Sequence, residues 1–131
     1  MASRVWGPMR RGGTELLVGV VTDPDWGKVL SVGLGGLWVE VLDDVSMRLL
    51  PVDEDDVAEM LAELRSAALL KGARGSTPAD IDRLCQVIVR IAGLAEGLGS
   101  ALDTLEVNPL RVEGGDVEVL DALVVWKGGQ L

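Results

Sequence analysis

The sequence predicts an α+β domain in which helices pack on one face of a mainly antiparallel β-sheet. Three observations predict this class: β-branched segments with short turns lie toward both ends of the chain, two amphipathic helices lie between them, and 48% of the 131 residues are hydrophobic. The apolar residues come in short blocks, well below the roughly 18 uninterrupted apolar residues that a membrane span needs. We therefore expect a folded domain with no membrane partner.

The first strands are expected near residues 15–33. ELLVGVVT (15–22) is aliphatic and β-branched, ends at the turn DPDWG (23–27), and resumes as KVLSVG (28–33). Such a pattern is typical of an antiparallel hairpin. LWVEVL (37–42) and SMRLLPV (46–52) then predict two more short extended segments.

Two helices are expected between the strand regions. Asp53 is a good cap for a helix over 53–66, since three acidic residues follow it at the positive end of the helix dipole. Its apolar face consists of Val57, Met60, Leu61 and Leu64. Thr77, followed by Pro78 at the first helical position, predicts the start of a longer second helix, which should end at Gly97 or Gly99. The apolar stripe of this helix consists of Ile81, Leu84, Cys85, Ile88, Ile91, Ala92 and Ala95.

Composition excludes several functional classes. The net charge of -9 repels nucleic acid phosphates, so nucleic acid is not an expected partner. The absence of histidine excludes Ser-His-Asp and Cys-His nucleophile systems and histidine-bound metals within this chain. Cys85 is the only cysteine and is interpreted as a core residue. The basic start of the chain has no apolar segment typical of a secretory signal, which predicts a cytoplasmic protein.

The last predicted hairpin carries a candidate metal site. If Gly114 and Gly115 are the central turn residues, counting outward along both strands places Asn108 directly opposite Asp121. Glu106 lies two residues from Asn108 and therefore on the same sheet face. Two carboxylates and an amide oxygen suit Mg²⁺, which completes its coordination with water and substrate phosphates. The alternative is that Asn108-Pro109 marks a bulge and that the acids are solvated hairpin residues.

Several ordered motifs in residues 12–124 resemble the ATP-grasp domain of NDP-forming acyl-CoA synthetases. They are GGTELLVGVVTDPDWGKVLSVGLGGLWVEVLDDVSMRLLPV, LLKGARG, LEVNPL and LDA, which resemble the family's G-G-x-E-L-x-V-G, G-L-G-G, V-E-V-x-x-D-V-S-x-R, L-L-x-G-x-R-G and E-x-N-P-L. The family includes the β subunits of ADP-forming acetyl-CoA synthetase and, more distantly, of succinyl-CoA synthetase. The resemblance implies the carboxy-terminal subdomain of the ATP-grasp fold.

The resemblance also implies roles for individual residues. Asn108 and Asp121 would hold the Mg²⁺ of a bound nucleotide, either ATP/ADP or GTP/GDP, and Glu106 would be catalytic, beside the phosphoryl group that is passed on. Gly33, Gly35, Gly36 and Arg48 would contribute to nucleotide binding. For the glycines the alternative is a plain turn. Arg48 and Arg74 match recurrent arginines of the family and could meet anionic phosphate, and the alternative for both is an ion pair with an internal carboxylate such as Glu40.

By the same resemblance, residues 1–14 would be the remnant of the adenine-hinge segment, 15–126 the subdomain itself and 127–131 a disordered tail. The other ATP-grasp half, the CoA-binding subunit or domain and the relay histidine would have to come from elsewhere, within a homo- or hetero-oligomer. The expected function is the nucleotide- and Mg-binding part of an enzyme that couples acid:CoA ligation to NTP cleavage. The alternative is a non-catalytic assembly module, a split or degenerate ATP-grasp remnant that pairs with another polypeptide.

Overall fold

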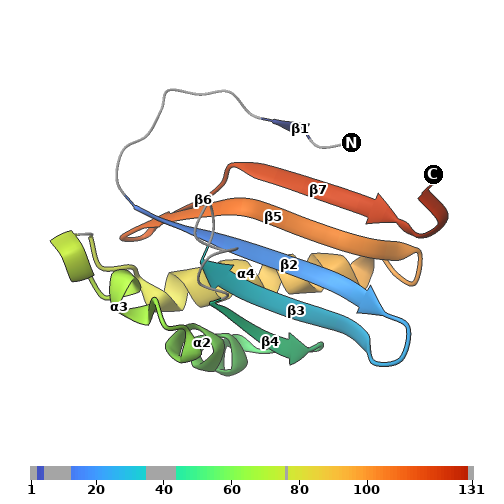
Figure 1. The fold of residues 1–131 in the computed structure, drawn as a ribbon, viewed down its shortest axis with the longest axis horizontal. Helices are drawn as coiled ribbons and strands as arrows, with labels where there is room; N and C mark the ends of the chain where they lie inside the picture. Colours follow the sequence, from blue (N-terminus) through green and yellow to red (C-terminus); the bar gives the residue numbers. More distant parts are fainter. Residues whose placement is uncertain (1–2, 5–12, 35–43, 76, 130–131) are drawn as a thin grey trace.

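The computed structural model describes residues 3–4, 13–34, 44–75 and 77–129 (Figure 1). The strands are β1 (Ser3–Arg4), β2 (Thr14–Asp23), β3 (Gly27–Leu34), β4 (Val45–Leu49), β5 (Leu102–Glu113), β6 (Asp116–Val119) and β7 (Asp121–Trp126). The helices are α2 (Glu54–Glu63), α3 (Ala67–Leu70) and α4 (Ile81–Gly97), with short 3-10 turns η2 (Ala73–Gly75) and η3 (Lys127–Gly129). None of the helices in the described part is long and apolar enough to cross a membrane.

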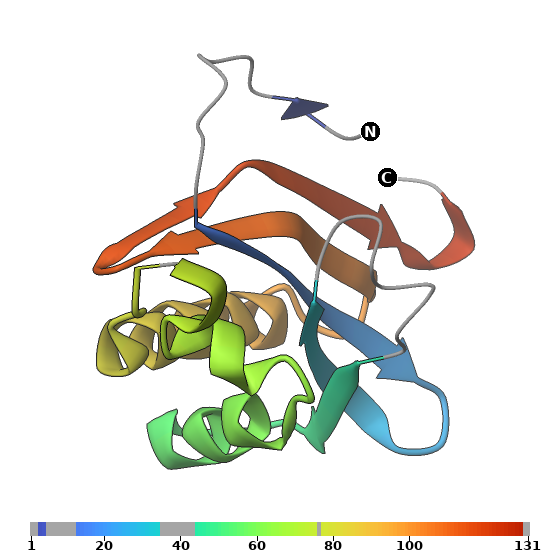
Figure 2. The same cartoon turned by 60° about the vertical axis from the view of Figure 1, so that its left-hand side comes forward.

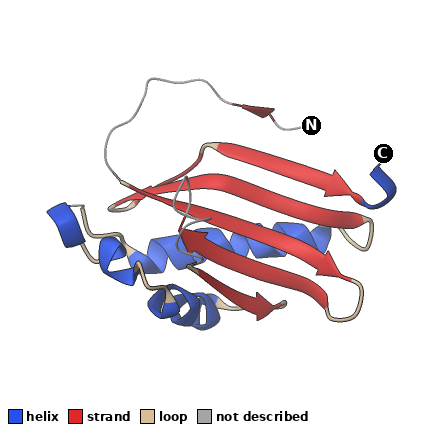
Figure 3. Ribbon diagram, in the orientation of Figure 1, coloured by secondary structure: helices blue, strands red, loops and turns tan. Residues whose placement is uncertain are grey.

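The strands form one sheet in the order β1-β7-β5-β2-β3-β4, and β6 pairs with β5 beside this path. All of these pairings are antiparallel. The helices lie together on one side of the sheet, which Figures 2 and 3 show from two directions. The predicted α+β class, with helices on one face of a mainly antiparallel sheet, is confirmed.

The first hairpin forms as predicted from the sequence. β2 and β3 pair from Leu16↔Leu34 to Asp23↔Gly27. In the turn, the Asp23 carboxylate accepts hydrogen bonds from the backbone N–H groups of Asp25 and Trp26, at 2.8 and 2.9 Å. Gly27 adopts a φ of +89°, a conformation that an L residue rarely adopts. The expected extended segment at 37–42 lies outside the described residues.

The first helix has the predicted cap but is shorter than predicted. Asp53 and Asp56 form a reciprocal capping box, in which each side chain accepts a hydrogen bond from the other's backbone N–H. The predicted apolar residues of 53–66 are all buried. However, α2 ends at Glu63 because Leu64 is extended, with a ψ of 138°, and the separate short helix α3 follows.

The predicted start of the second helix at Thr77 and Pro78 is wrong. Asp80 is the N-cap, and its carboxylate accepts a hydrogen bond from the N–H of Arg83. The chain before it is held by tertiary hydrogen bonds, from the Ala79 N–H to the Leu70 carbonyl and from the Asp80 N–H to the Gly114 carbonyl. In a helix that started at residue 77, these two N–H groups would point in other directions, and both hydrogen bonds would be lost. The helix ends at Gly97, within the expected range.

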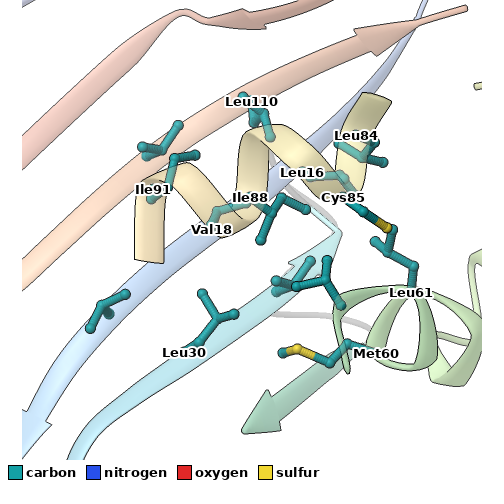
Figure 4. Close-up of a cluster of buried hydrophobic side chains, with 14 of the residues drawn as sticks. Leu16, Val18, Leu30, Met60, Leu61, Leu84, Cys85, Ile88, Ile91 and Leu110 are labelled. Atoms are coloured by element: carbon teal, nitrogen blue, oxygen red, sulfur yellow. The ribbon is translucent and has the colours of Figure 1, made fainter. Parts of the chain in front are cut away.

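The hydrophobic core lies between the sheet and the helices (Figure 4). In β2, Val18 and Val20 are fully buried against this layer, as are Leu30 of β3 and Ile88 of α4. Cys85 is buried in the same core, and burial raises the pKa of its thiol to about 11, which agrees with its interpretation as a core residue. The opposite side of the sheet, which no described helix covers, is called the open face below.

Leu30→Ala should lower the free energy of unfolding by about 2–5 kcal/mol, because it opens a cavity in the centre of this core. Leu94→Ala is the matched control, since Leu94 lies on α4 with 56% of its surface exposed, and it should change stability by at most about 0.5 kcal/mol. Urea unfolding followed by circular dichroism measures both. Equal effects of the two substitutions would contradict the core described above.

Candidate functional site

The register of the second hairpin is the one predicted from a turn at Gly114 and Gly115. β5 and β6 pair from Glu113↔Asp116 to Leu110↔Val119, and β5 and β7 continue in the same register with Val107↔Ala122 and Glu106↔Leu123. The Leu120 N–H also donates to the Pro109 carbonyl at 3.1 Å. Asn108 and Asp121 occupy the next opposing positions, between the two paired stretches.

A bulge in β5 interrupts the ladder at Asn108 and the cis-bonded Pro109. Against β2, the pairing shifts between Leu16↔Leu110 and Val18↔Val107, so two residues of β5 stand opposite Leu17 alone. Val107 and Leu110 are therefore both buried toward the helices, although three positions separate them. The bulge at Asn108-Pro109 is therefore present, and it occurs together with the clustering of the candidate side chains.

Glu106, Asn108 and Asp121 line one hollow, together with Ala122 and Leu123. The Asn108 amide nitrogen lies 3.4 Å from Glu106 Oε1, and Asp121 Oδ1 accepts the Ala122 N–H at 2.9 Å. Asn108 is exposed, whereas both carboxylates are partly buried. Two like charges beside an amide oxygen form a donor set of hard oxygens, which is the ligand type that Mg²⁺ prefers.

The glycines of the predicted nucleotide site are only partly described. Gly33 lies in β3, opposite Leu17 of β2 and Val45 of β4. A Cβ atom at this position would lie 2.7 Å from the Asp44 carbonyl oxygen, so the close approach of the two strands accounts for this glycine. Gly35 and Gly36 lie outside the described residues, and their role in nucleotide binding stays a prediction.

Arg48 lies on the helix-facing side of β4, away from the hollow. Its guanidinium forms a bidentate contact with the Glu63 carboxylate of α2 and lies 3.5 Å from Glu59. Ser46, two residues earlier on the same side, donates a hydrogen bond to Glu63 at 2.6 Å. The structure thus pairs Arg48 with an internal carboxylate, Glu63, and does not bring it to Glu106, Asn108 and Asp121. Glu40 lies outside the described residues.

Asp44 was not singled out from the sequence. Its buried carboxylate accepts hydrogen bonds from the backbone N–H groups of Arg65 and Ser66, at 2.6 and 2.7 Å. Together with Ser46 and Arg48 it joins β4 to the end of α2, and we call these three residues the β4 clasp. The signal in the sequence was the alternation of polar residues in Asp44-Val45-Ser46-Met47-Arg48, which places all three on one face of a strand.

Comparison with known proteins finds a family and several relatives. Residues 5–125 match the family described as the ATP-grasp domain. The chain belongs to the ATP-grasp family. Similar proteins include the β subunit of ADP-forming acetate–CoA ligase II of Pyrococcus furiosus, 36% identical over 123 residues that cover 92% of this chain and 52% of that subunit. The ADP-forming 4-hydroxybutyrate–CoA ligase of Nitrosopumilus maritimus is 36% identical over 88% of this chain and 17% of its own length.

The ATP-grasp fold is also seen in a solved relative. A dinucleotide-forming acetyl-coenzyme A synthetase 1 of Ca. Korarchaeum cryptofilum superposes with a TM-score of 0.82 and 32% sequence identity, over 90% of this chain and 55% of that chain. That structure is described as a complex with coenzyme A and Mg-AMPPCP, with its phosphohistidine segment pointing towards the nucleotide-binding site. The present chain spans about half the length of this structure and of the Pyrococcus subunit.

The β4 clasp should make stability depend on pH. Burial raises the pKa of Asp44, but hydrogen bonds from Ser66 and Arg65 outweigh it and lower the pKa below its usual value. Hydrogen bonding from Arg48 likewise lowers the pKa of Glu63. Groups with a lowered folded pKa stabilise the fold above their unfolded pKa of about 4, and this stability is lost as the pH falls through the folded value.

Urea unfolding measured from about pH 7 to pH 3 tests this expectation. The free energy of unfolding should fall on acidification, and Asp44→Asn should lower it by about 1–3 kcal/mol at neutral pH, because buried N–H donors lose an acceptor. The dependence on pH should be weaker in the variant. Asp25→Asn, in the exposed turn between β2 and β3, is the control and should match the parent. Parallel profiles of the Asp44→Asn variant and the parent would contradict the assignment.

Proposed function

We propose that this chain binds Mg²⁺-nucleotide on its open face, as part of an enzyme that joins an acid to CoA with NTP cleavage. In this proposal Asn108 and Asp121 bind the metal, and Glu106 lies beside the phosphoryl group that is transferred. The observation that carries the proposal is the grouping of these three side chains around one hollow of an ATP-grasp domain. ADP-forming CoA ligases among the similar proteins support the reaction class.

The donor set fits a hard divalent cation. Two carboxylates in one hollow repel each other without a cation, whereas Asn108 adds an oxygen ligand and no charge. When bound, Mg²⁺ would neutralise the charge on nucleotide phosphates and stabilise charge that develops on the transferred phosphoryl group. The chain itself would hold the two ligand side chains in a fixed relative position, because both belong to strands of one sheet.

The open face also offers a surface for a partner. Val21, Val45, Met47 and Leu49 are exposed on it, with 40–62% of their surface accessible to solvent. Exposed apolar side chains gathered on one face mark interaction surfaces. Since similar proteins are about twice as long or longer, we propose that the other ATP-grasp half covers this face. The CoA-binding subunit or domain would be a further partner.

Asp121→Asn should abolish Mn²⁺ binding, where Mn²⁺ serves as a paramagnetic substitute for Mg²⁺. Asn108→Ala should weaken binding less, because the amide oxygen contributes no net charge. Without metal, Asp121→Asn should unfold at the same temperature as the parent or slightly higher, since one of two like charges in the hollow is removed. Mn²⁺ titration by electron paramagnetic resonance and a thermal melt measure these effects.

Asp116→Asn is the matched control for the metal titration. Asp116 is exposed and belongs to the same hairpin, but it lies at the Gly114-Gly115 turn and does not line the hollow. This variant should bind Mn²⁺ like the parent. Unchanged Mn²⁺ binding in Asp121→Asn would refute the metal site and favour the alternative function, a non-catalytic module that only pairs with another polypeptide.

The 131 residues assayed alone should not ligate acetate to CoA. The chain has no histidine for a phosphohistidine relay, and it spans about half of the similar subunit. Purified protein with acetate, CoA, ATP or GTP and Mg²⁺ is assayed for acetyl-CoA and phosphate release. Turnover near the typical enzyme rate of about 10 per second would show that the site is complete without a partner.

A further inference from the structure

β4 forms one edge of the sheet, and its outer side pairs with no strand of the described part (Figure 1). On its inner side, the Asp44 carbonyl accepts the Leu34 N–H at 3.2 Å, and the Leu50 N–H donates to the Lys28 carbonyl at 2.9 Å. Since every second residue of an antiparallel strand bonds to a given neighbour, the even-numbered residues here bond to β3. The N–H and C=O groups that point to the free edge belong to Val45, Met47 and Leu49.

The same three residues carry exposed apolar side chains. Between 40 and 62% of the surface of each is accessible, and all three lie on the open face. Unpaired backbone groups beside apolar side chains are a template for pairing with a further strand. In the described part, one hydrogen bond uses a backbone group of this edge, from Arg48 Nη1 to the Met47 carbonyl at 2.8 Å. β4 therefore has both features by which one strand recognises another.

A second copy of the chain fits this edge if the two β4 strands run antiparallel and cross at Met47. Met47 then stands opposite Met47 of the second copy, and Val45 stands opposite Leu49 of that copy. Odd-numbered residues meet odd-numbered residues, so the free N–H and C=O groups of one edge face those of the other. The exposed side chains of both copies form one apolar row on the open face. The edge is thus complementary to itself, as a two-fold interface requires.

The charges on the helix-facing side match in the same arrangement. Arg48 stands opposite Ser46 of the second copy, and Ser46 donates to the Glu63 carboxylate of its own chain at 2.6 Å. Arg48 is thereby placed beside Glu63 of the second copy as well as its own Glu63, and symmetry repeats this contact. Its guanidinium then leaves the Met47 carbonyl, which accepts the Met47 N–H of the second copy instead. Opposite charges meet at this seam, which favours the pairing.

We propose that β4 is a dimerisation edge, at which two copies of this chain join their sheets by antiparallel pairing about Met47. The proposal goes beyond nucleotide binding and does not depend on it. The hollow lies on β5 and β7, which β2 and β3 separate from β4. Pairing at the edge extends the sheet sideways, so the open face of each copy stays accessible to other partners.

Met47→Cys tests the register of the pairing. Opposing residues of a hydrogen-bonded antiparallel pair have Cα atoms about 5.5 Å apart, a distance that a disulfide spans. Under mild oxidation this variant should form a covalent dimer, which non-reducing electrophoresis detects. Leu94→Cys is the matched control, since Leu94 is similarly exposed but lies on α4, and it should cross-link about tenfold more slowly or less. The parent should not cross-link, because its cysteine, Cys85, is buried and its thiol pKa is raised to about 11.

Met47→Lys tests the pairing without a covalent bond. The parent should change from monomer to dimer in a concentration series followed by light scattering. Met47→Lys should raise the dissociation constant of the dimer about tenfold or more, because two like charges would stand opposite each other at the two-fold axis. Leu94→Lys is the control and should dimerise like the parent. Thermal melts show whether each variant folds, and if Met47→Lys does not fold, the cross-linking experiment decides.

Three results would overturn the proposal. The first is a parent that stays monomeric at high protein concentration. The second is a Met47→Cys variant that cross-links no faster than Leu94→Cys. The third is a dimer that Met47→Lys leaves intact, since the two copies would then be joined by another surface.

Discussion

The alternation of side chains along β2 is the constraint on which the rest of the structure depends. Leu16, Val18 and Val20 are buried against the helices, so the residues between them face the other way. Because β2 pairs with both β5 and β3, its alternation sets the orientation of the neighbouring strands as well. One face of the sheet thereby becomes the core, and the other carries the candidate site and the exposed apolar side chains.

The bulge in β5 changes this alternation at one place. Two residues, Asn108 and Pro109, stand opposite one residue of β2, so burial along β5 resumes at Leu110 rather than at residue 109. Both ends of the strand can then pack against the same helix layer. The irregular backbone also separates β6 from β7. Asn108 and Asp121 stand opposite each other at this point but do not form a ladder pair. Bulges of this kind commonly re-aim a side chain beside a functional site.

Polar residues serve different purposes on the two faces of the sheet. On the helix-facing side, the β4 clasp satisfies its one carboxylate and its guanidinium internally, through contacts with the N–H groups of Arg65 and Ser66 and with Glu63. On the open face, Glu106 and Asp121 share a hollow with Asn108, Ala122 and Leu123. Paired charges of the first kind fasten one element to another, whereas the second arrangement is suited to an external cation.

The sequence by itself determined what depends on neighbouring residues. Alternation, helical periodicity, the Asp53 cap and the Gly114-Gly115 turn identified the hairpins, the helix faces and the opposition of Asn108 and Asp121, and ordered motifs identified the family. Only the tertiary structure decided that Asp80 is the N-cap of α4, which depends on hydrogen bonds to Leu70 and Gly114. The partner of Arg48 was likewise decided by the packing of α2 against β4, since that contact joins residues 15 positions apart in the chain. Local propensity determines periodicity and turns, but it does not determine which distant polar groups meet when helices and strands pack together.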